Sequence, residues 1–137
     1  MTRVQYVVWN DNYSVKVVSL DDQHKKILEL INDIYNAKRQ NQADSKVSHA
    51  LLELRDYSIT HLSDEESLLK KCGYSDFEIH KKVHDDFRKE SEQLLRMQRD
   101  IMGDISIEVL DFLKAWWTKH ILGMDQKYVQ CVTVSVT

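Results

Sequence analysis

The sequence of 137 residues contains no proline and only three glycines. Proline breaks helices and glycine weakens them, so their scarcity favours a largely helical chain. Cysteine is also scarce: Cys72 and Cys131 are too few for a disulfide framework and do not form a CxxC pair. We therefore expect both cysteines to be reduced structural thiols.

Long apolar runs and a strong charge of one sign are missing as well. No apolar run approaches the roughly 20 residues that cross a bilayer, and the start, MTRVQYVVWNDNY, lacks the pattern of a signal peptide. A net charge of −3, from 19 basic and 22 acidic residues, indicates neither nucleic acid nor an anionic membrane as partner. We expect a cytoplasmic protein with no membrane span.

Four segments carry apolar residues in steps of three and four, the period of an amphipathic helix. The predicted helices begin near Ser19, Asp44 and Ser75, and the fourth follows a turn at Gly103-Asp104. Short connections make neighbouring helices antiparallel, so we predict an all-α, up-down-up-down antiparallel four-helix bundle. Residues 1–137 form a single domain: an extended N-terminal arm (1–18), the bundle (19–128) and a β-prone tail (129–137) that is either an extended strap or disordered.

Five of the six histidines and two carboxylates lie on these four segments at helix-compatible spacings. They are His24, His61 with Glu65, His80 with His84, and His120 with Asp125. A buried imidazole without a partner costs about 1 to 3 kcal/mol, and a buried carboxylate costs more. A bundle of marginal stability could not hold all seven unless metal ions offset the cost. The sequence therefore predicts a buried metal site with these seven ligands.

Two of the pairs are four residues apart, so their members face the same side of a helix. His120 and Asp125 are five residues apart, which in a regular helix turns Asp125 about 140° away from His120. We predict a π-type bulge near Gly123 that brings Asp125 to the inner face. A helix of unbroken regular hydrogen bonding from His120 to Asp125 would contradict this prediction.

The number of ligands exceeds what one tetrahedral zinc ion takes, and imidazole with carboxylate suits iron, copper, zinc or nickel alike. If two octahedral ions share both carboxylates and one further oxygen atom, the ligands fill every coordination position but one. A single open position on a pair of metal ions is suited to a small diatomic ligand.

From about residue 6 to residue 128 the sequence resembles the bacterial hemerythrins. The matching residues are Trp9, Tyr13-Ser14-Val15, DDQHK at 21–25, HLSDEE at 61–66, HKKVH at 80–84, WWTKHI at 116–121, Asp125 and Lys127-Tyr128. No ligand position departs from the family pattern, although Lys16 stands where the family usually has glycine. The order of the motifs, H, HxxxE, HxxxH and HxxxxD, is highly specific.

The resemblance implies a non-haem site of two iron ions (Fe²⁺ or Fe³⁺) with a bridging oxo or hydroxo group, which binds O₂ reversibly for storage, transport or delivery. By position, the resemblance implies that His80, His84 and His120 hold the coordinatively complete iron. His24 and His61 then hold the iron with the open position, and the carboxylates of Glu65 and Asp125 bridge the two.

An apolar pocket is expected at the open position, where it would exclude water. The candidates are Leu28, Ile31, Leu113 and Trp116, although for any single one of them ordinary bundle core is the better explanation. We expect Trp117 to pack at a helix interface rather than at the metal.

Two other functions remain open: an oxygen or redox sensor that acts through a separate partner, and an enzyme that acts on O₂, peroxide or nitric oxide. Di-iron oxygenases use mostly carboxylates, whereas five imidazoles dominate this site. We therefore expect an oxygen-binding protein with no catalytic residues, although weak oxidase or peroxidase activity is left open. Its expected partners are dioxygen and an enzyme that accepts it, and we expect a monomer.

Overall fold

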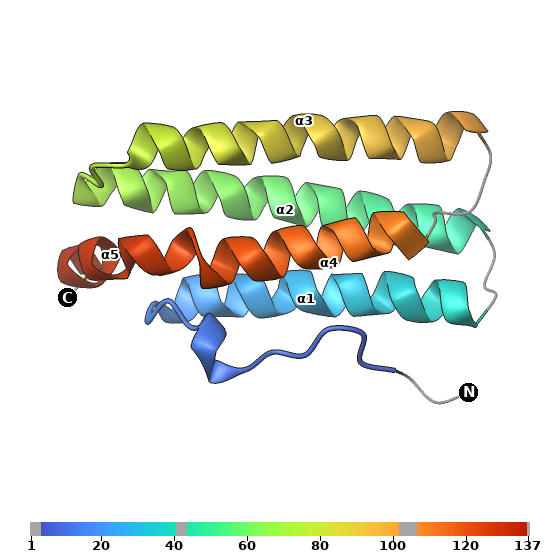
Figure 1. The fold of residues 1–137 in the computed structure, drawn as a ribbon, viewed down its shortest axis with the longest axis horizontal. Helices are drawn as coiled ribbons and strands as arrows, with labels where there is room; N and C mark the ends of the chain where they lie inside the picture. The colour runs from blue at the N-terminus through green and yellow to red at the C-terminus, as the bar shows by residue number, and fades with distance from the viewer. Residues whose placement is uncertain (1–3, 41–43, 102–106, 137) are drawn as a thin grey trace.

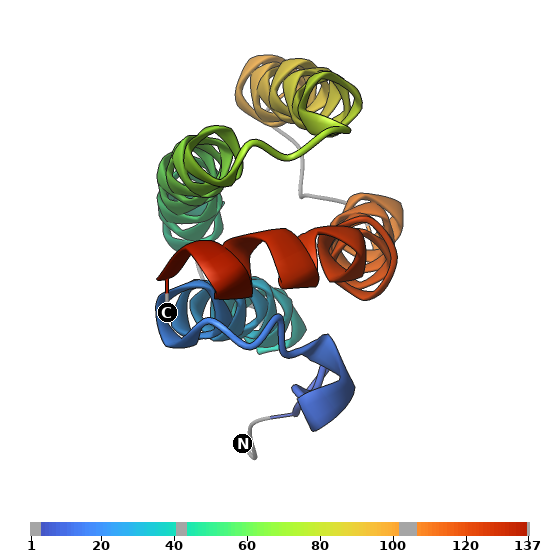
Figure 2. The same ribbon diagram turned by 90° about the vertical axis from the view of Figure 1, so that its left-hand side faces the viewer.

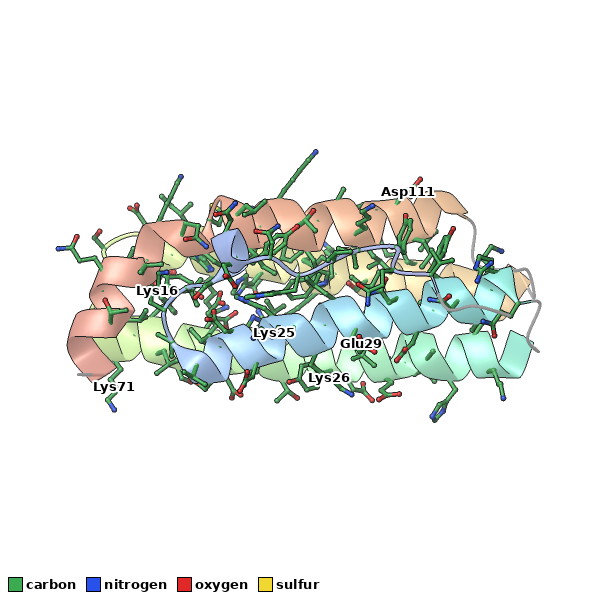
Figure 3. All side chains as sticks on the ribbon, turned by 90° about the horizontal axis from the view of Figure 1, so that it is seen from below. Lys16, Lys25, Lys26, Glu29, Lys71 and Asp111 are labelled. Atoms are coloured by element: carbon green, nitrogen blue, oxygen red, sulfur yellow. A yellow bond between two sulfur atoms is a disulfide. The ribbon has the colours of Figure 1, made fainter. Side chains whose placement is uncertain are left out.

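A computed structural model describes residues 4–40, 44–101 and 107–136, and four long helices make up most of it (Figure 1). They are α1 (Val18–Arg39), α2 (Asp44–Cys72), α3 (Phe77–Ile101) and α4 (Ile107–Leu122). Successive helices run in opposite directions (Figure 1), which confirms the predicted antiparallel bundle. Charged side chains such as Lys26, Glu29 and Lys71 cover its outside (Figure 3). None of the described helices is both long and apolar enough to cross a membrane.

The N-terminal arm is extended, as predicted, and contains one short 3₁₀ helix, η1 (Asp11–Tyr13). Two asparagine amides of α1 hold it against the bundle. The Val7 N–H donates to Asn32 Oδ1 at 2.9 Å, and Asn32 Nδ2 donates to the Val7 carbonyl at 2.8 Å. Asn36 makes the same pair of bonds with Val4, both at 2.7 Å. Each amide thus satisfies a backbone N–H and C=O as a neighbouring strand would.

The C-terminal residues are helical, so the predicted extended or disordered tail is wrong. After α4 the chain passes through a 3₁₀ helix, η2 (Asp125–Tyr128), into α5 (Val129–Val136), which crosses the end of the bundle (Figure 2). Valine and threonine favour strands, but tertiary packing overrides this preference. Val132 is 1% exposed, and α5 packs on α2.

A disulfide joins Cys72, the last residue of α2, to Cys131 in α5. The expectation of two reduced thiols is therefore wrong. The two residues are 59 positions apart, and only the return of α5 across the bundle brings their Cα atoms to 5.7 Å. Because the sequence pattern gave no sign of that helix, it could not indicate the bond.

The buried apolar side chains form two clusters. The main cluster fills the long part of the bundle and includes Ile27, Ile31, Leu62, Leu113 and Trp117. The end cluster lies under α5 and consists of Val15, Val17, Leu20, Leu69, Tyr128 and Val132. Along α1 and α2, buried polar side chains stand between members of the two clusters. The fold therefore contains a polar layer between two apolar ones, near the end that α5 covers.

Candidate metal centre

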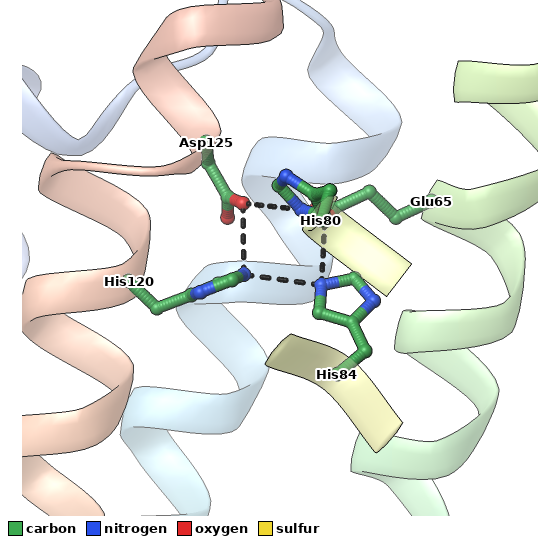
Figure 4. A group of neighbouring side chains, drawn as sticks. All are labelled: Glu65, His80, His84, His120 and Asp125. Carbon is green, nitrogen blue, oxygen red and sulfur yellow. Dashed lines mark hydrogen bonds and ion pairs between the residues drawn. The ribbon is translucent and has the colours of Figure 1, made fainter. Parts of the chain in front are cut away.

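The polar layer is formed by the five histidines and two carboxylates that the sequence singled out. Each of the seven is at most 5% exposed. Their order along the chain is His24 on α1, His61 and Glu65 on α2, His80 and His84 on α3, His120 on α4, and Asp125 at the start of η2. The structure thus brings all seven predicted residues to one place, and Figure 4 shows five of them.

Glu65 lies at the centre of this layer, with a different pair of histidines at each oxygen. Its Oε2 is 3.5 Å from His24 Nε2 and 3.3 Å from His61 Nε2. Its Oε1 is 2.8 Å from His80 Nε2 and 3.2 Å from His84 Nε2. One carboxylate therefore faces two separate groups of imidazoles.

The two oxygens of Asp125 likewise face different histidines. Its Oδ2 lies 3.2 Å from His24 Nε2, while its Oδ1 lies 3.2 Å from His80 Nε2 and 3.1 Å from His120 Nε2. The donor atoms of each group lie within 4.8 Å of one another. One group contains His80, His84 and His120 with both carboxylates, and the other contains His24, His61 and Glu65.

Asp125 reaches the layer because the helix is interrupted, as predicted, but the kind of interruption differs. Regular bonding ends where the Gly123 N–H donates to the Lys119 carbonyl at 2.8 Å. The next turn is 3₁₀, with the Lys127 N–H bonded to the Met124 carbonyl at 3.2 Å. The predicted π-type bulge is wrong, because the chain winds more tightly here rather than more widely.

The adjacent residue Gln126 supports this interruption. Its Nε2 donates to the carbonyls of Ile121 and Ser14, both at 3.2 Å. The side chain therefore satisfies a carbonyl of the last turn of α4 and ties that turn to the N-terminal arm. A carbonyl at a helix end needs such a partner when it is shielded from water.

Gln23 orients the ring of His61. Its Oε1 is 2.7 Å from His61 Nδ1, and its Nε2 donates to Asp64 Oδ2 at 3.0 Å. An amide oxygen can only accept, so the proton of His61 is on Nδ1 and its Nε2 lone pair faces Glu65. This is the tautomer that a metal ligand needs.

Glu66 orients His84 in the same manner. Its Oε2 lies 2.7 Å from His84 Nδ1 and 2.8 Å from Arg88 Nη1. Sequence reasoning did not assign a role to Gln23 or Glu66. The signal was their position, because each directly precedes or follows a predicted ligand in the chain.

Tyr128 contacts the layer from the side of α5, and sequence reasoning also missed its role. Its hydroxyl donates to Glu65 Oε2 at 2.8 Å. Burial, together with the charges of Asp125 and Glu65, raises the pKa of Tyr128 well above its usual value. The phenol therefore stays protonated and remains a donor to the carboxylate.

The imidazoles and carboxylates shift one another's protonation when no metal is bound. Burial disfavours the charged form of Glu65, but the surrounding histidines outweigh it and hold the Glu65 pKa well below its usual value. The Asp125 pKa is lowered too, because His120 and His24 outweigh burial and the charge of Glu65. Burial also opposes the charged forms of His24 and His80, yet the two carboxylates raise the pKa of each to about 9.

Several buried atoms of the layer make no hydrogen bond within the described residues, which tests whether a metal fits. They are both ring nitrogens of His24, His61 Nε2, His80 Nδ1 and both Asp125 oxygens. Leaving a buried polar atom unsatisfied costs about 1 to 3 kcal/mol. Cations bound between the two histidine groups would satisfy the atoms that face inward. The donors therefore fit metal ions that accept imidazole and carboxylate.

Of the four residues expected in an apolar pocket, three lie in the main cluster and one stacks on a predicted ligand. Leu28, Ile31 and Leu113 are buried in the main cluster, which their role as bundle core also explains. Trp116 stacks on the ring of His120, with 4.4 Å between ring centroids and an interplanar angle of 13°. Trp116, the one aromatic residue among the four, thus contacts a predicted ligand directly.

Trp117 of α4 packs against Phe87 of α3, the expected kind of helix contact, and its ring also contacts that of a predicted ligand. It is fully buried, and its ring centroid is 5.8 Å from that of His61. It packs in the main cluster as well, so the expected helix contact and the contact with a predicted ligand occur together.

Comparison with known proteins agrees with this geometry. Residues 15–132 match the family model described as "Hemerythrin HHE cation binding domain". A bacteriohemerythrin of Pseudomonas aeruginosa is 33% identical over 133 residues, covering 96% of this chain and 85% of the relative. One from Clostridium acetobutylicum is 33% identical, with 89% and 98% covered. The crystal structure of a wild-type hemerythrin superposes with a TM-score of 0.87 at 26% identity, covering 93% of this chain and 98% of that one.

Proposed function

Because this chain belongs to the hemerythrin family, we propose that its buried donors hold two iron ions and bind dioxygen reversibly. The observation that carries the proposal is the uneven division of the donors. Each carboxylate offers one oxygen to a group of three imidazoles and the other to a group of two. Two metal ions held in this way would differ by one protein ligand, and the poorer one would have room for a small ligand.

In this proposal His80, His84 and His120 would hold the first iron, His24 and His61 would hold the second, and Glu65 and Asp125 would be shared by both, together with an oxo or hydroxo group. A pair of iron ions supplies the electrons that a reversible complex with O₂ requires. Five of the seven ligands are imidazoles, whereas di-iron oxygenases depend mainly on carboxylates. This ligand set favours storage or delivery of O₂ over oxidation of a substrate.

The other residues of the chain prepare the site for this role. Gln23 and Glu66 fix two of the imidazole rings, so that their Nε2 atoms face inward before a metal binds. Tyr128 donates to Glu65 and limits the rotation of that carboxylate. The main cluster and the end cluster cover the layer on both sides and exclude water from it. Exclusion of water and protons keeps bound O₂ from leaving as superoxide or peroxide.

The test is a reversibility experiment. The iron-loaded protein is reduced without air, O₂ is admitted, and the visible spectrum is followed while O₂ is removed again. A coloured complex that disappears on removal of O₂ and returns on its readmission is the expected result. Immediate and irreversible oxidation of the iron would contradict the proposal.

The ligand assignment has its own test. His61→Ala should reduce the iron content below two ions per chain, because the group of two imidazoles loses one. His49→Ala is the matched control, since His49 is exposed on the same helix and lies outside both donor groups. If His61→Ala still binds two irons, the assignment is wrong.

A further inference from the structure

We propose that the Cys72–Cys131 disulfide is a redox-active site for a dithiol reductant, and that its reduction releases α5 and speeds the exchange of metal from the centre. The bond joins the last residue of α2 to α5, the helix that crosses the end of the bundle (Figure 2). The proposal rests on the metal site of the proposed function but does not require that the site bind O₂.

The first step concerns what the bond connects. Cys72 ends the helix that carries Glu65, which lies seven residues, or about two helical turns, before it. Cys131 lies six residues after Asp125, beyond η2. The bond therefore fixes the segment that carries one bridging carboxylate to the helix that carries the other. These two carboxylates are the residues that face both groups of histidines.

The second step concerns what else holds α5 in place. This helix has eight residues, VQCVTVSV, most of which are β-branched. Such a short helix is not stable alone, so its position depends on its contacts with the rest of the protein. Among the described side chains, those contacts include the apolar residues of the end cluster, with Val132 and Tyr128, and the disulfide. Without the bond, α5 opens more often.

The third step links α5 to the centre. Tyr128 is the residue immediately before α5, and its hydroxyl donates to Glu65 Oε2. It also belongs to the end cluster that separates the polar layer from the outside. When α5 moves away, Tyr128 loses its neighbours Val129 and Val132, and water gains access to Glu65 and Asp125. A metal ion exchanges its protein ligands for water or a chelator more readily once water can enter the site.

The bond is accessible to a reductant. Both cysteines are half-buried rather than buried, and the neighbouring residues Lys70 and Lys71 are exposed. One thiolate of the dithiol attacks a sulfur of the bond and forms a mixed disulfide, which its second thiol then resolves. Two electrons and two protons pass to Cys72 and Cys131, and the dithiol leaves as a disulfide.

The experiment uses the full chain, loaded with Zn²⁺ only after the redox treatment, because Zn²⁺ is not reduced by thiols but is bound by dithiols. One portion is treated with dithiothreitol, another is kept oxidised with glutathione disulfide, and both are desalted without air before Zn²⁺ is added. The thiols are counted by the mass added by iodoacetamide. A coloured chelator then reports the rate of Zn²⁺ release. We expect the reduced protein to release Zn²⁺ about tenfold faster or more, given the usual effect of such a cross-link.

Reversal and a variant provide the controls. Treatment of the reduced protein with glutathione disulfide should restore slow release without any mutation. The double variant Cys72→Ser with Cys131→Ser should release Zn²⁺ at the rate of the reduced protein and should not respond to dithiothreitol. Its far-ultraviolet circular dichroism shows whether it is folded.

Three results would overturn the proposal. The first is equal release from the oxidised and reduced wild type. The second is a folded wild type in which dithiothreitol exposes no alkylatable thiol, and the third is failure of the two thiols to pair under glutathione disulfide. None of these results bears on reversible O₂ binding, so failure of this proposal and failure of the proposed function are distinguishable.

Discussion

At the scale of single residues, Glu65 is the side chain on which the centre depends most. Four imidazole nitrogens lie within 3.5 Å of its two oxygens, and a tyrosine hydroxyl donates to one of them. It is also fully buried. Water cannot reach this buried carboxylate to make up for a lost partner, so removal of any one contact should change stability or metal binding measurably.

Removal of the Tyr128 hydroxyl tests the contact from the side of α5. Tyr128→Phe should lower the free energy of unfolding by about 1 to 2 kcal/mol, because Glu65 loses a donor in a buried site. Urea denaturation of the metal-free protein measures this change. Tyr74→Phe is the matched control, since Tyr74 is half-buried and its ring contacts that of Tyr128. Equal effects of the two variants would show that the hydrogen bond to Glu65 contributes nothing.

The pH dependence of the metal-free protein follows from the histidines. The pKa values of His24 and His80 are raised from 6.5 to about 9 in the folded state. Their stabilising effect is complete below pH 6.5 and is lost as the pH rises to about 9. The pKa of His61, which burial lowers, opposes this in part. We expect the urea concentration at the unfolding midpoint of chelator-treated protein to decrease as the pH is raised from 6.5 to 9.

The carboxylates limit stability from the acid side. The pKa of Glu65 is lowered from 4.5, so its contribution to stability is present above that value and is lost as the pH falls further.

The stability of the metal-loaded protein should instead rise between pH 6.5 and 9, because metal ligands must be deprotonated and metal binding therefore strengthens as the pH rises. If the urea midpoint changes with pH in the same way in the metal-loaded and the metal-free protein, this account is wrong.

At the scale of elements, the N-terminal arm depends on asparagine amides rather than on strand pairing. Asn32→Leu should lower the free energy of unfolding by about 2 kcal/mol, because the Val7 N–H and C=O both lose their partner. Asn32→Asp keeps the acceptor for the Val7 N–H but turns a buried carboxylate oxygen toward the Val7 carbonyl, so it should cost at least as much. Thermal denaturation measures both, and Lys26→Leu, at an exposed site of the same helix, is the control. A cost for Asn32→Leu no larger than that for Lys26→Leu would argue against the paired bonds.

The same scale shows what the sequence could predict and why. Apolar residues repeat every three or four positions along α1 to α4, and this local period predicts both the helices and the inward faces of six of the seven donors. Asp125 was also predicted to reach the centre, but the 3₁₀ turn that brings it there depends on the Gln126 bonds to Ile121 and Ser14.

Two elements near the C-terminus could not be predicted from local pattern. The β-branched residues of α5 favour strands in isolation, and only the burial of Val132 against the bundle makes them helical. The disulfide depends on that packing in turn, since Cys72 and Cys131 meet only after α5 has crossed the end of the bundle. Contacts distant in sequence determine both features.

At the scale of the whole molecule, the proposed metal site predicts that the stability of the folded state depends on metal. Removal of metal with a chelator should lower the melting temperature, because a ligand present at a thousand times its dissociation constant stabilises the folded state by about 4 kcal/mol. Calorimetry before and after addition of Fe²⁺ without air measures the difference. Far-ultraviolet circular dichroism should show that the bundle stays helical at low temperature. An unchanged melting temperature would mean that the layer binds no metal.

The position of the polar layer between the two apolar clusters also determines how the chain opens. The main cluster has apolar residues from α1 to α4, whereas the end cluster is smaller, and along α1 and α2 buried donors stand between members of the two. With ions bound, both parts share ligands and should exchange their amide hydrogens as one cooperative unit. Without ions, the amides under α5 should exchange first. The metal would then determine how many folding units the protein has.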